Sequence, residues 1–344
     1  MDSPDDDEKT ATPEILDDDR VAPGLVDEAD VQDSEDSNKD SFDIQLEQTL
    51  KETEEAVLTL DQVNSNPDAT KLWLAAGEVV RDFKPVPWFI WRLSNFVLGR
   101  AGHIGEVSEG LVFGLRRLMF AVASDSVLGS GEKVNSVRKA LSLVPSDVIA
   151  AAAVVHAICR RLAKKPHERI WKPILDDALL RAQIGFRVGR QCESFGGGRG
   201  MLAGFAGRAG LTVLIAGGDL DSARKALELL ATGKTIKETG LLVYKCDPLQ
   251  VSAMLLTASG IGRDAAFGTV SFAIDPDNPP LVSEEQKRWF ATFQIVEFVR
   301  ANEIARIPET SWEIVNCSDD DRSRIIDAAK IAVRRGHGWH WMQA

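Results

Sequence analysis

Several residue types that are typical of particular chemistries are scarce in this sequence of 344 residues. It contains four cysteines, five histidines and a single tyrosine. The cysteines are widely spaced, form no CxxC pair and lack the density of a disulfide framework. We therefore expect reduced thiols and a cytoplasmic protein.

Membrane, secretory and nucleic-acid-binding signals are also missing. No uncharged hydrophobic run reaches about 18 residues, and the N-terminus is acidic where a signal peptide would be basic and then apolar. No basic stripe with interleaved aromatic residues is present, and no G-x-x-x-x-G-K-[ST] phosphate loop occurs. These absences favour a chain with neither a membrane nor a nucleic-acid partner.

What the sequence does have is a strong imbalance of charge. Residues 1–40 contain sixteen acidic and three basic residues, a net of −13, whereas the whole chain carries −12. The same 40 residues have no aromatic and few aliphatic side chains, so they cannot bury enough apolar area to offset the entropy of ordering. We predict a disordered acidic tail over residues 1–42, which acts as a solubilising arm or, alternatively, contacts a basic partner.

The rest of the chain is predicted to be all-α. Apolar residues recur at helical spacing, and clusters of Gly and Pro separate the segments. No run alternates cleanly enough to demand a strand, and no fixed-period repeat is visible, although a helical-repeat scaffold is an alternative. The expected helices are an amphipathic one over 42–60 and then 69–83, 87–98, 104–122, 132–142, 146–164, 168–192, 199–216, 219–232, 235–244, 248–258, 262–273, 283–301 and 319–335.

The glycine-rich stretch that begins at Gly196 allows two interpretations. Residues 198–203 fit the dinucleotide-binding pattern G-x-G-x-x-A, but this pattern needs a buried strand directly before it, and the preceding QCESF is poor strand material. Alternatively, Gly204, Gly207 and Gly210 lie along one side of a helix and let another backbone approach. We predict tight helix packing without a dinucleotide, after a break at 196–198.

In this context, the order of segments from residue 85 onward resembles the HDOD family, the output-domain relatives of the HD metal-dependent phosphohydrolases. Residues 85–98 (PVPWFIWRLSNFVL) look like the opening turn and first helix of that family, and residues 123–126 (ASDS) stand near its A-N-S turn. Residues 134–154 resemble its I-x-S-I-x-x-A-I-x-x-L-G segment, and residues 170–189 resemble its tryptophan-led helix. The likeness spans about 200 residues and depends on the order and spacing of these segments.

The resemblance implies a site that has lost its metal ligands. In the HD enzymes the glycine helix reads approximately L-L-H-D-I-G, and Gly207 and Arg208 stand where the His-Asp pair would bind divalent metals. The tryptophan-led helix offers Asp176 and Asp177 instead of a histidine, and Asp247 stands where related sequences often carry one. A glycine cannot ligate a metal, and the charge of an arginine repels one. These five residues therefore imply a vestigial cleft with no catalytic residue, metal or cofactor.

The resemblance also implies an organisation and a function. We expect a disordered tail over 1–42, a helical segment over 43–79, an HDOD-like domain over 80–282 and a helical extension packed on it over 283–344. The implied function is a non-enzymatic signalling or regulatory output module that binds a protein partner. An alternative is a nucleotide or another small anion held in the vestigial cleft by Arg208.

The C-terminal residues contain two histidines, His337 and His340, at a spacing that could hold zinc on a helix. Gly336 ends the preceding predicted helix, however, and no third ligand is close in the sequence. We expect Trp339 and Trp341 to dock this tail against the domain instead.

Overall fold

The structure is a computed structural model that describes residues 41–56, 67–110, 112–274 and 280–343. Within these residues all regular secondary structure is helical and no strand occurs, which confirms the predicted all-α fold. The predicted acidic tail lies almost wholly outside the described residues. A first helix covers residues 41–56, and the others are α2 (Pro67–Phe83), α3 (Trp88–Leu98), η1 (Phe113–Leu115), α4 (Arg116–Ser124), α5 (Val137–Leu143), α6 (Ser146–Leu162), α7 (Glu168–Gly189), α8 (Gly196–Gly217), α9 (Leu220–Ala231), α10 (Ile236–Tyr244), α11 (Pro248–Ala258), α12 (Arg263–Ile274), α13 (Glu284–Ala301), η2 (Ile304–Arg306), α14 (Glu309–Ile314), α15 (Asp319–Arg335) and η3 (His340–Gln343).

Side-chain caps account for many of the helix starts. A polar residue directly before the helix accepts a hydrogen bond from a backbone N–H of the first turn, which has no partner inside the helix. The predicted helix over 132–142 therefore begins later, at Val137, after its cap at Ser136. The capping residues are Ser136, Asp219, Thr235, Asp247, Ser283 and Ser318.

The predicted helix over 104–122 is wrong in its first half, because residues 104–110 form an irregular segment and α4 begins only at Arg116. The N–H of Gly105 donates to the carbonyl oxygen of Val97 at 3.1 Å, so this segment runs along the end of α3. A β-carbon at Gly105 would come within 2.6 Å of the carbonyl oxygen of Phe96. The close contact needs a glycine and holds the backbone away from a helical path.

The predicted break at residues 196–198 is also wrong, because α8 begins at Gly196. The N–H of Gly198 donates to Oδ2 of Asp147, a buried residue of α6, at 2.6 Å. This carboxylate supplies an acceptor that the first turn of α8 otherwise lacks. A β-carbon at Gly198 would collide with the backbone of Asp147, so the glycine gives this contact its room.

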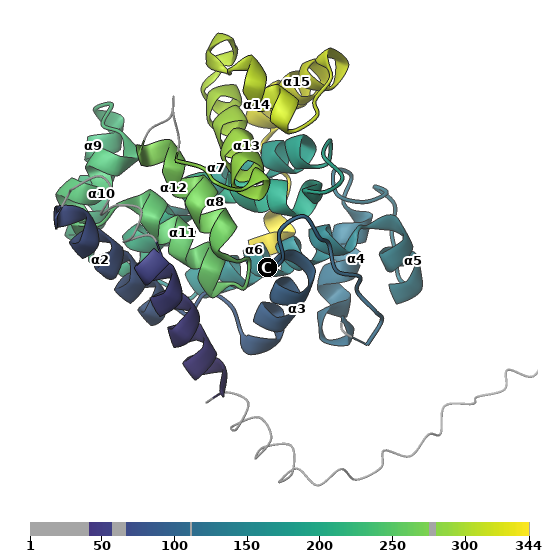
Figure 1. The fold of residues 1–344 in the computed structure, drawn as a ribbon, viewed down its shortest axis with the longest axis horizontal. Helices are drawn as coiled ribbons and strands as arrows, with labels where there is room; N and C mark the ends of the chain where they lie inside the picture. Colours follow the sequence, from purple (N-terminus) through teal and green to yellow (C-terminus); the bar gives the residue numbers. More distant parts are fainter. Residues whose placement is uncertain (1–40, 57–66, 111, 275–279, 344) are drawn as a thin grey trace, which may run out of the picture. The chain divides into compact units, whose positions relative to one another are not determined.

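Helix α8 is the central element of residues 42–344 (Figure 1). From Gly196 to Ala216 every residue except Arg208 is buried, and α6, α7, α11 and α13 all pack against it. By length and composition alone α8 could cross a membrane, but 89% of its apolar window is buried by the rest of the protein, as in a core helix. Helices far apart in the sequence meet on α8, which does not fit a helical-repeat scaffold whose repeats contact only their neighbours.

Glycines let the backbones of α7 and α8 touch, which confirms the predicted tight packing. A β-carbon at Gly200 would collide with the carbonyl oxygen of Gly185, and one at Gly204 would collide with that of Arg181. A β-carbon at Gly189 would lie 2.7 Å from the α-carbon of Gly200. No side chain larger than a hydrogen atom fits at these positions unless the helices separate.

The glycines spaced three apart do not lie on one side of α8, contrary to the prediction. Gly204 faces α7, whereas a β-carbon at Gly207 would lie 2.7 Å from Oε1 of Glu297 on α13. A β-carbon at Gly210 would collide with the carbonyl oxygen of Pro248 on α11. A step of three residues turns an α-helix by about 300°. Each of these glycines therefore admits a different neighbouring helix.

The C-terminal residues dock on the helical core, as predicted. Trp339 is fully buried and Trp341 packs against the core, while η3 contacts α6. The ring nitrogen Nδ1 of His156 on α6 lies 2.9 Å from the carbonyl oxygen of Met342. The rings of His337 and His340 lie 5.0 Å apart, and His337 is buried.

A smaller apolar cluster fixes α13, α14 and α15 to α7. The cluster includes Leu180 and Ile184 from α7, Val296 from α13, Trp312 from α14 and Ile325 from α15. Helix α13 thus packs against both α7 and α8, and this packing brings its charged residues to those of the two helices. The finer predicted divisions at residues 79/80 and 282/283 stay predictions.

We predict that Gly204→Ala destabilises the protein by about 1–3 kcal/mol, because the added methyl group forces α7 and α8 apart. Gly217→Ala is the matched control, since a β-carbon at Gly217 meets nothing within 4 Å. Urea unfolding followed by circular dichroism measures both free energies of unfolding. Equal stability of the two variants would show that the helices do not touch at Gly204.

Candidate functional site

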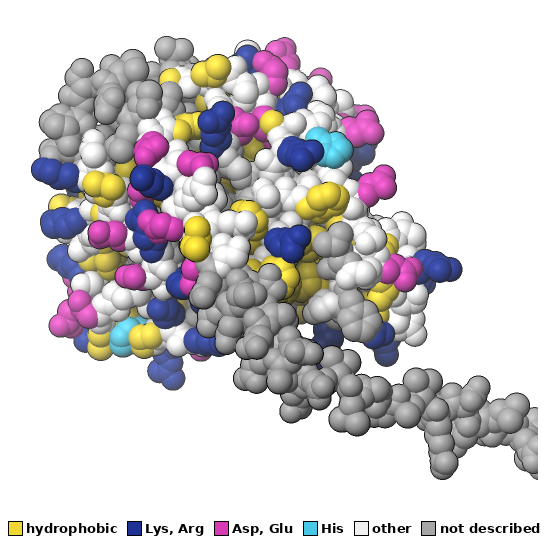
Figure 2. Space-filling model, turned by 60° about the horizontal axis from the view of Figure 1, so that its bottom comes forward, with side chains coloured by type: hydrophobic (Ala, Val, Ile, Leu, Met, Phe, Trp, Pro, Cys, Tyr) yellow, Lys and Arg dark blue, Asp and Glu magenta, His cyan; other side chains and the backbone are white. Residues whose placement is uncertain are grey.

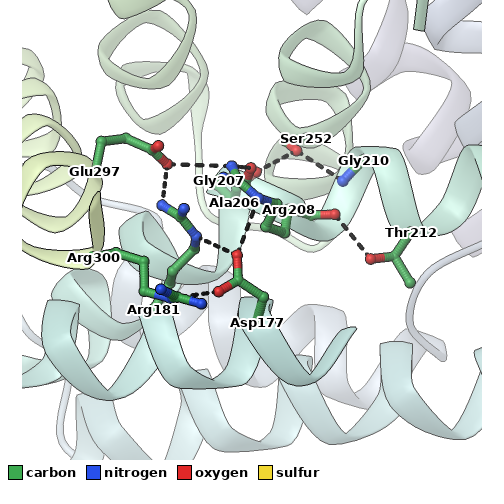
Figure 3. A network of polar contacts seen from close by, with 10 residues as sticks. All are labelled: Asp177, Arg181, Ala206, Gly207, Arg208, Gly210, Thr212, Ser252, Glu297 and Arg300. Carbon is green, nitrogen blue, oxygen red and sulfur yellow. Dashed lines mark hydrogen bonds and ion pairs between the residues drawn. The ribbon is translucent and has the colours of Figure 1, made fainter. Parts of the chain in front are cut away.

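The packing of α7, α8 and α13 brings five charged side chains into one ion-pair network (Figure 3). Asp177 and Arg181 come from α7, Arg208 from α8, and Glu297 and Arg300 from α13. The side chain of Arg181 is only 4% exposed, and the other four are partly buried. Two of the five residues predicted for the vestigial cleft, Asp177 and Arg208, therefore meet directly.

Asp177 is the acceptor that all three arginines share. Its Oδ2 lies 2.8 Å from Nε of Arg181 and 3.1 Å from Nε of Arg208, while its Oδ1 lies 2.6 Å from Nε of Arg300. Oε1 of Glu297 lies 2.5 Å from Nη1 of Arg181 and 3.5 Å from Nη1 of Arg208. The two carboxylates thus bridge arginines from three different helices.

The electrostatics of the ion-pair network favour charged carboxylates. Burial on its own would raise the pKa of the Asp177 carboxyl, but the guanidinium groups of Arg181, Arg208 and Arg300 outweigh burial and hold this pKa below its ordinary value. Burial and the neighbouring Arg181 lower the pKa of Arg208. Three cations and two anions leave the network with a formal charge of +1.

Gly207 belongs to the same place for a steric reason. A β-carbon there would lie 2.7 Å from Oε1 of Glu297, the oxygen that contacts both Arg181 and Arg208. Any larger residue at position 207 would push this carboxylate away from its arginines. The glycine therefore gives Glu297 access to the network.

Asp176 points to a different set of partners. Its Oδ1 lies 3.2 Å from Nε2 of His337 and accepts a hydrogen bond from Nε2 of Gln343 at 2.9 Å. Burial lowers the pKa of His337, although the Asp176 carboxylate opposes this effect. Asp176 anchors the C-terminal residues, so the structure gives it different partners from those of Asp177.

Asp247 is also separate from the ion-pair network. It is buried, caps α11 by accepting from the N–H of Leu249 at 2.9 Å, and lies 3.9 Å from Nζ of Lys237. Burial raises the pKa of its carboxyl, partly offset by the Leu249 N–H and by Lys237. Its contacts are those of a helix cap.

The described residues contain no group of three or more His, Cys, Asp or Glu that could hold a metal ion. At the ion-pair network the two carboxylates, Asp177 and Glu297, are occupied by arginines. A divalent cation there would meet three guanidinium groups at short range, and this repulsion opposes binding. The side chains present do not fit a metal centre.

Sequence reasoning missed three members of the ion-pair network: Arg181, Glu297 and Arg300. One signal was available, because Asp177 and Arg181 stand four residues apart, the spacing of ion pairs on a helix surface. No local pattern marked Glu297 or Arg300, since they reach the network only through the packing of α13. Their role follows from tertiary structure alone.

A second buried ion pair was also missed. Arg199 in α8 is 1% exposed, and its Nε lies 3.1 Å from Oε1 of the buried Glu285. The guanidinium group also donates to carbonyl oxygens of Leu98, Arg100 and His103, at 3.1, 2.6 and 2.7 Å. Arg199 thereby ties the segment after α3 to the core, which is a structural role.

The fold resembles that of a solved protein. The crystal structure of the "Putative phosphohydrolase" from Shewanella amazonensis SB2B superposes with a TM-score of 0.55 and 14% sequence identity, over 78% of this chain and 98% of that chain. At this identity the likeness shows the fold alone, and it is consistent with the HD-like helical fold that the sequence resemblance implied. No protein-family model and no curated protein matches the chain.

We predict that Asp177→Asn destabilises the protein at neutral pH by about 3 kcal/mol, because it leaves three arginines with one carboxylate. The folded-state pKa of Asp177 lies below its ordinary 3.8, so its contribution is present above that pH and is lost as the pH falls through the folded-state pKa. The stability difference between wild type and Asp177→Asn should therefore shrink in acid.

Urea unfolding at a series of pH values measures this difference. Asp327→Asn is the control, since Asp327 on α15 is exposed and forms a single ion pair among the described residues, with Lys330 at 3.3 Å. A difference for Asp177→Asn that stays constant down to strongly acidic pH would contradict the proposed charge state.

Proposed function

We propose that this chain is a non-catalytic regulatory module of the HDOD type, which acts in the cytoplasm by binding a protein partner. The helical fold shared with the Shewanella protein supports an HD-like scaffold. The sequence segments between residues 85 and 189 supply the finer likeness to HDOD. The chain differs from the HD enzymes at the position of their metal-binding His-Asp pair, where it has Gly207 and Arg208.

The ion-pair network is the observation that carries the proposal. A metal-dependent phosphohydrolase holds its divalent ions with an excess of neutral and negative ligands and uses them to activate water. Here Arg208 extends from that position to Asp177 and Glu297, and the network has an excess of positive charge. The guanidinium groups take the place of the metal ions as counter-charges, but they cannot activate water.

Helix α3 offers the surface that best fits a partner. Phe89, Arg92 and Phe96 lie three and seven residues apart and share one exposed face, with Phe89 43% and Phe96 55% exposed. Figure 2 shows hydrophobic side chains among Lys and Arg side chains on the underside of the molecule. Exposed aromatic residues beside arginines are typical of binding hot spots.

The charges near α3 indicate the chemistry of the partner. Arg92 and Arg100 are exposed, and neither forms an ion pair within the described part of the chain. The guanidinium carbon of Arg92 lies 5.7 Å from the ring centre of Trp88. An amphipathic segment with an apolar face and acidic flanks would cover the phenylalanines and neutralise both arginines.

The alternative, an anion bound in the vestigial cleft by Arg208, has less support. Nε and Nη1 of Arg208 already contact Asp177 and Glu297, and Nη1 also donates to the carbonyl oxygen of Gly207 at 2.7 Å. An incoming anion would compete with two carboxylates for the same donors. Asp247, proposed to lie nearby, instead caps α11.

We expect the purified protein to contain no stoichiometric iron, manganese or zinc, and to hydrolyse no phosphodiester when these metals are added. The reason is the repulsion of divalent ions by the three arginines of the ion-pair network. Elemental analysis and a chromogenic phosphodiesterase assay provide the measurement. Metal at one equivalent together with turnover that Asp177→Asn abolishes would overturn the proposal.

For the partner surface we expect Phe96→Ser to weaken partner binding by more than about tenfold, as for a central aromatic hot spot. The partner is identified by photocrosslinking from α3 in the native cell and is then titrated in purified form. Leu242→Ser is the matched control, since Leu242 on α10 is also 55% exposed. Equal effects of the two substitutions would exclude α3 as the binding surface.

A further inference from the structure

A pocket of about 540 Å³ opens between the end of α2, the start of α3 and the last two turns of α6. This volume is in the range of small-molecule sites, about 300–1,000 Å³. The pocket is distinct from the ion-pair network, with which it shares no residue. Its lining residues are Asp82, Phe83, Pro87, Phe89, Ile90, Leu115, His156, Ala157, Arg160, Arg161, Lys164 and Lys165.

One wall of the pocket is basic. Arg160, Arg161, Lys164 and Lys165 lie within six residues at the end of α6, and within the described residues none of them forms an ion pair. The carbonyl end of a helix favours cations, but it does not neutralise four of them. Burial lowers the pKa of Arg161, which means that this guanidinium group has lost hydration without gaining a counter-charge.

Most of the other lining residues are apolar. They include Phe83, Pro87, Ile90 and Leu115, and Phe89, which is 43% exposed. Among the described lining residues, Asp82 is the single carboxylate. A ligand that fits both groups of residues has several negative charges at one end and a flat or apolar group at the other.

A neighbouring pocket of about 320 Å³ shares Asp82, Phe83 and Lys165 with the first. It is lined also by Tyr244, whose hydroxyl group is buried and has no hydrogen-bond partner in the described protein. Buried polar atoms normally have a partner, and an exception indicates a missing ligand or solvent molecule. Lys165 and the Tyr244 hydroxyl group thus offer further polar contacts beside the basic wall.

We propose that the pocket between α2, α3 and α6 binds a nucleoside polyphosphate, with the phosphates on Arg160, Arg161, Lys164 and Lys165 and the base against Phe89. Guanidinium and ammonium groups are the usual phosphate partners in proteins. An aromatic ring supplies a stacking surface for a base of any identity. Within the part of the chain that the structure describes, these cations have no carboxylate partner, so binding there breaks no ion pair.

A ligand bound in this pocket would regulate the protein, in addition to the partner that binds α3. Phe89 lies both in the pocket and on the exposed face of α3, so a bound base covers part of the face that we assign to the partner. The ligand would therefore compete with partner binding. The ligand site does not depend on the partner surface, and each can fail without the other.

Isothermal titration calorimetry of the full chain with ATP, tripolyphosphate and adenosine tests the contributions of the phosphates and of the base to binding separately. We expect ATP to bind most tightly, tripolyphosphate more weakly, and adenosine not measurably. Arg161→Gln combined with Lys164→Gln should weaken ATP and tripolyphosphate by at least about tenfold, because each lost charged hydrogen bond contributes strongly. Phe89→Ala should weaken ATP severalfold and leave tripolyphosphate unchanged.

Lys133→Gln combined with Lys139→Gln is the charge-matched control, since both lysines are exposed and lie outside the pocket. Its affinity for ATP should equal that of the wild type. No binding of ATP by the wild type, or equal losses in the two double variants, would overturn the proposal. Binding without hydrolysis agrees with both proposals, whereas hydrolysis would contradict only the non-catalytic function.

Discussion

The contact between the backbones of α7 and α8 is the constraint on which the rest of the structure depends. Glycines at positions 185, 189, 200 and 204 remove the side chains that would keep the two helices apart. Such a contact has little freedom to slide, because a displaced helix would bring β-carbons against carbonyl oxygens. It thereby fixes the register in which Asp177 and Arg181 of α7 stand opposite Arg208 of α8.

Buried charges need counter-charges, and the ion-pair network shows how this scaffold supplies them. Asp177 and Glu297 are drawn together by helix packing, which would be unfavourable without cations between them. In a metal-dependent hydrolase, mobile ions supply that positive charge and also bind the substrate. Here the positive charge is covalently attached through Arg181, Arg208 and Arg300. The carboxylate oxygens of Asp177 and Glu297 are thus already bound by arginines.

The sequence predicts the helices better than it predicts what they bring together. Capping residues and apolar periodicity are local, so most helix bounds were correct within two or three residues. The failures at residues 104–110 and 196–198 have tertiary causes, namely the contact of Gly105 with α3 and the capping of α8 by Asp147 from another helix. The family resemblance placed Asp177 and Arg208 in one cleft but did not pair them, whereas Glu297 and Arg300 had no sequence signal.

The two groups of cations in this protein differ in a way that decides where an anion can bind. In the ion-pair network the guanidinium donors are already directed at carboxylates, so an anion must displace a partner of equal charge. Residues 160–165, at and just after the end of α6, carry four positive charges that form no ion pair with the described residues, and they line a pocket together with apolar side chains. An anion there relieves repulsion among the cations and displaces only water. The ion-pair network and the proposed ligand pocket are therefore different places, and the basic residues of the second favour anion binding there.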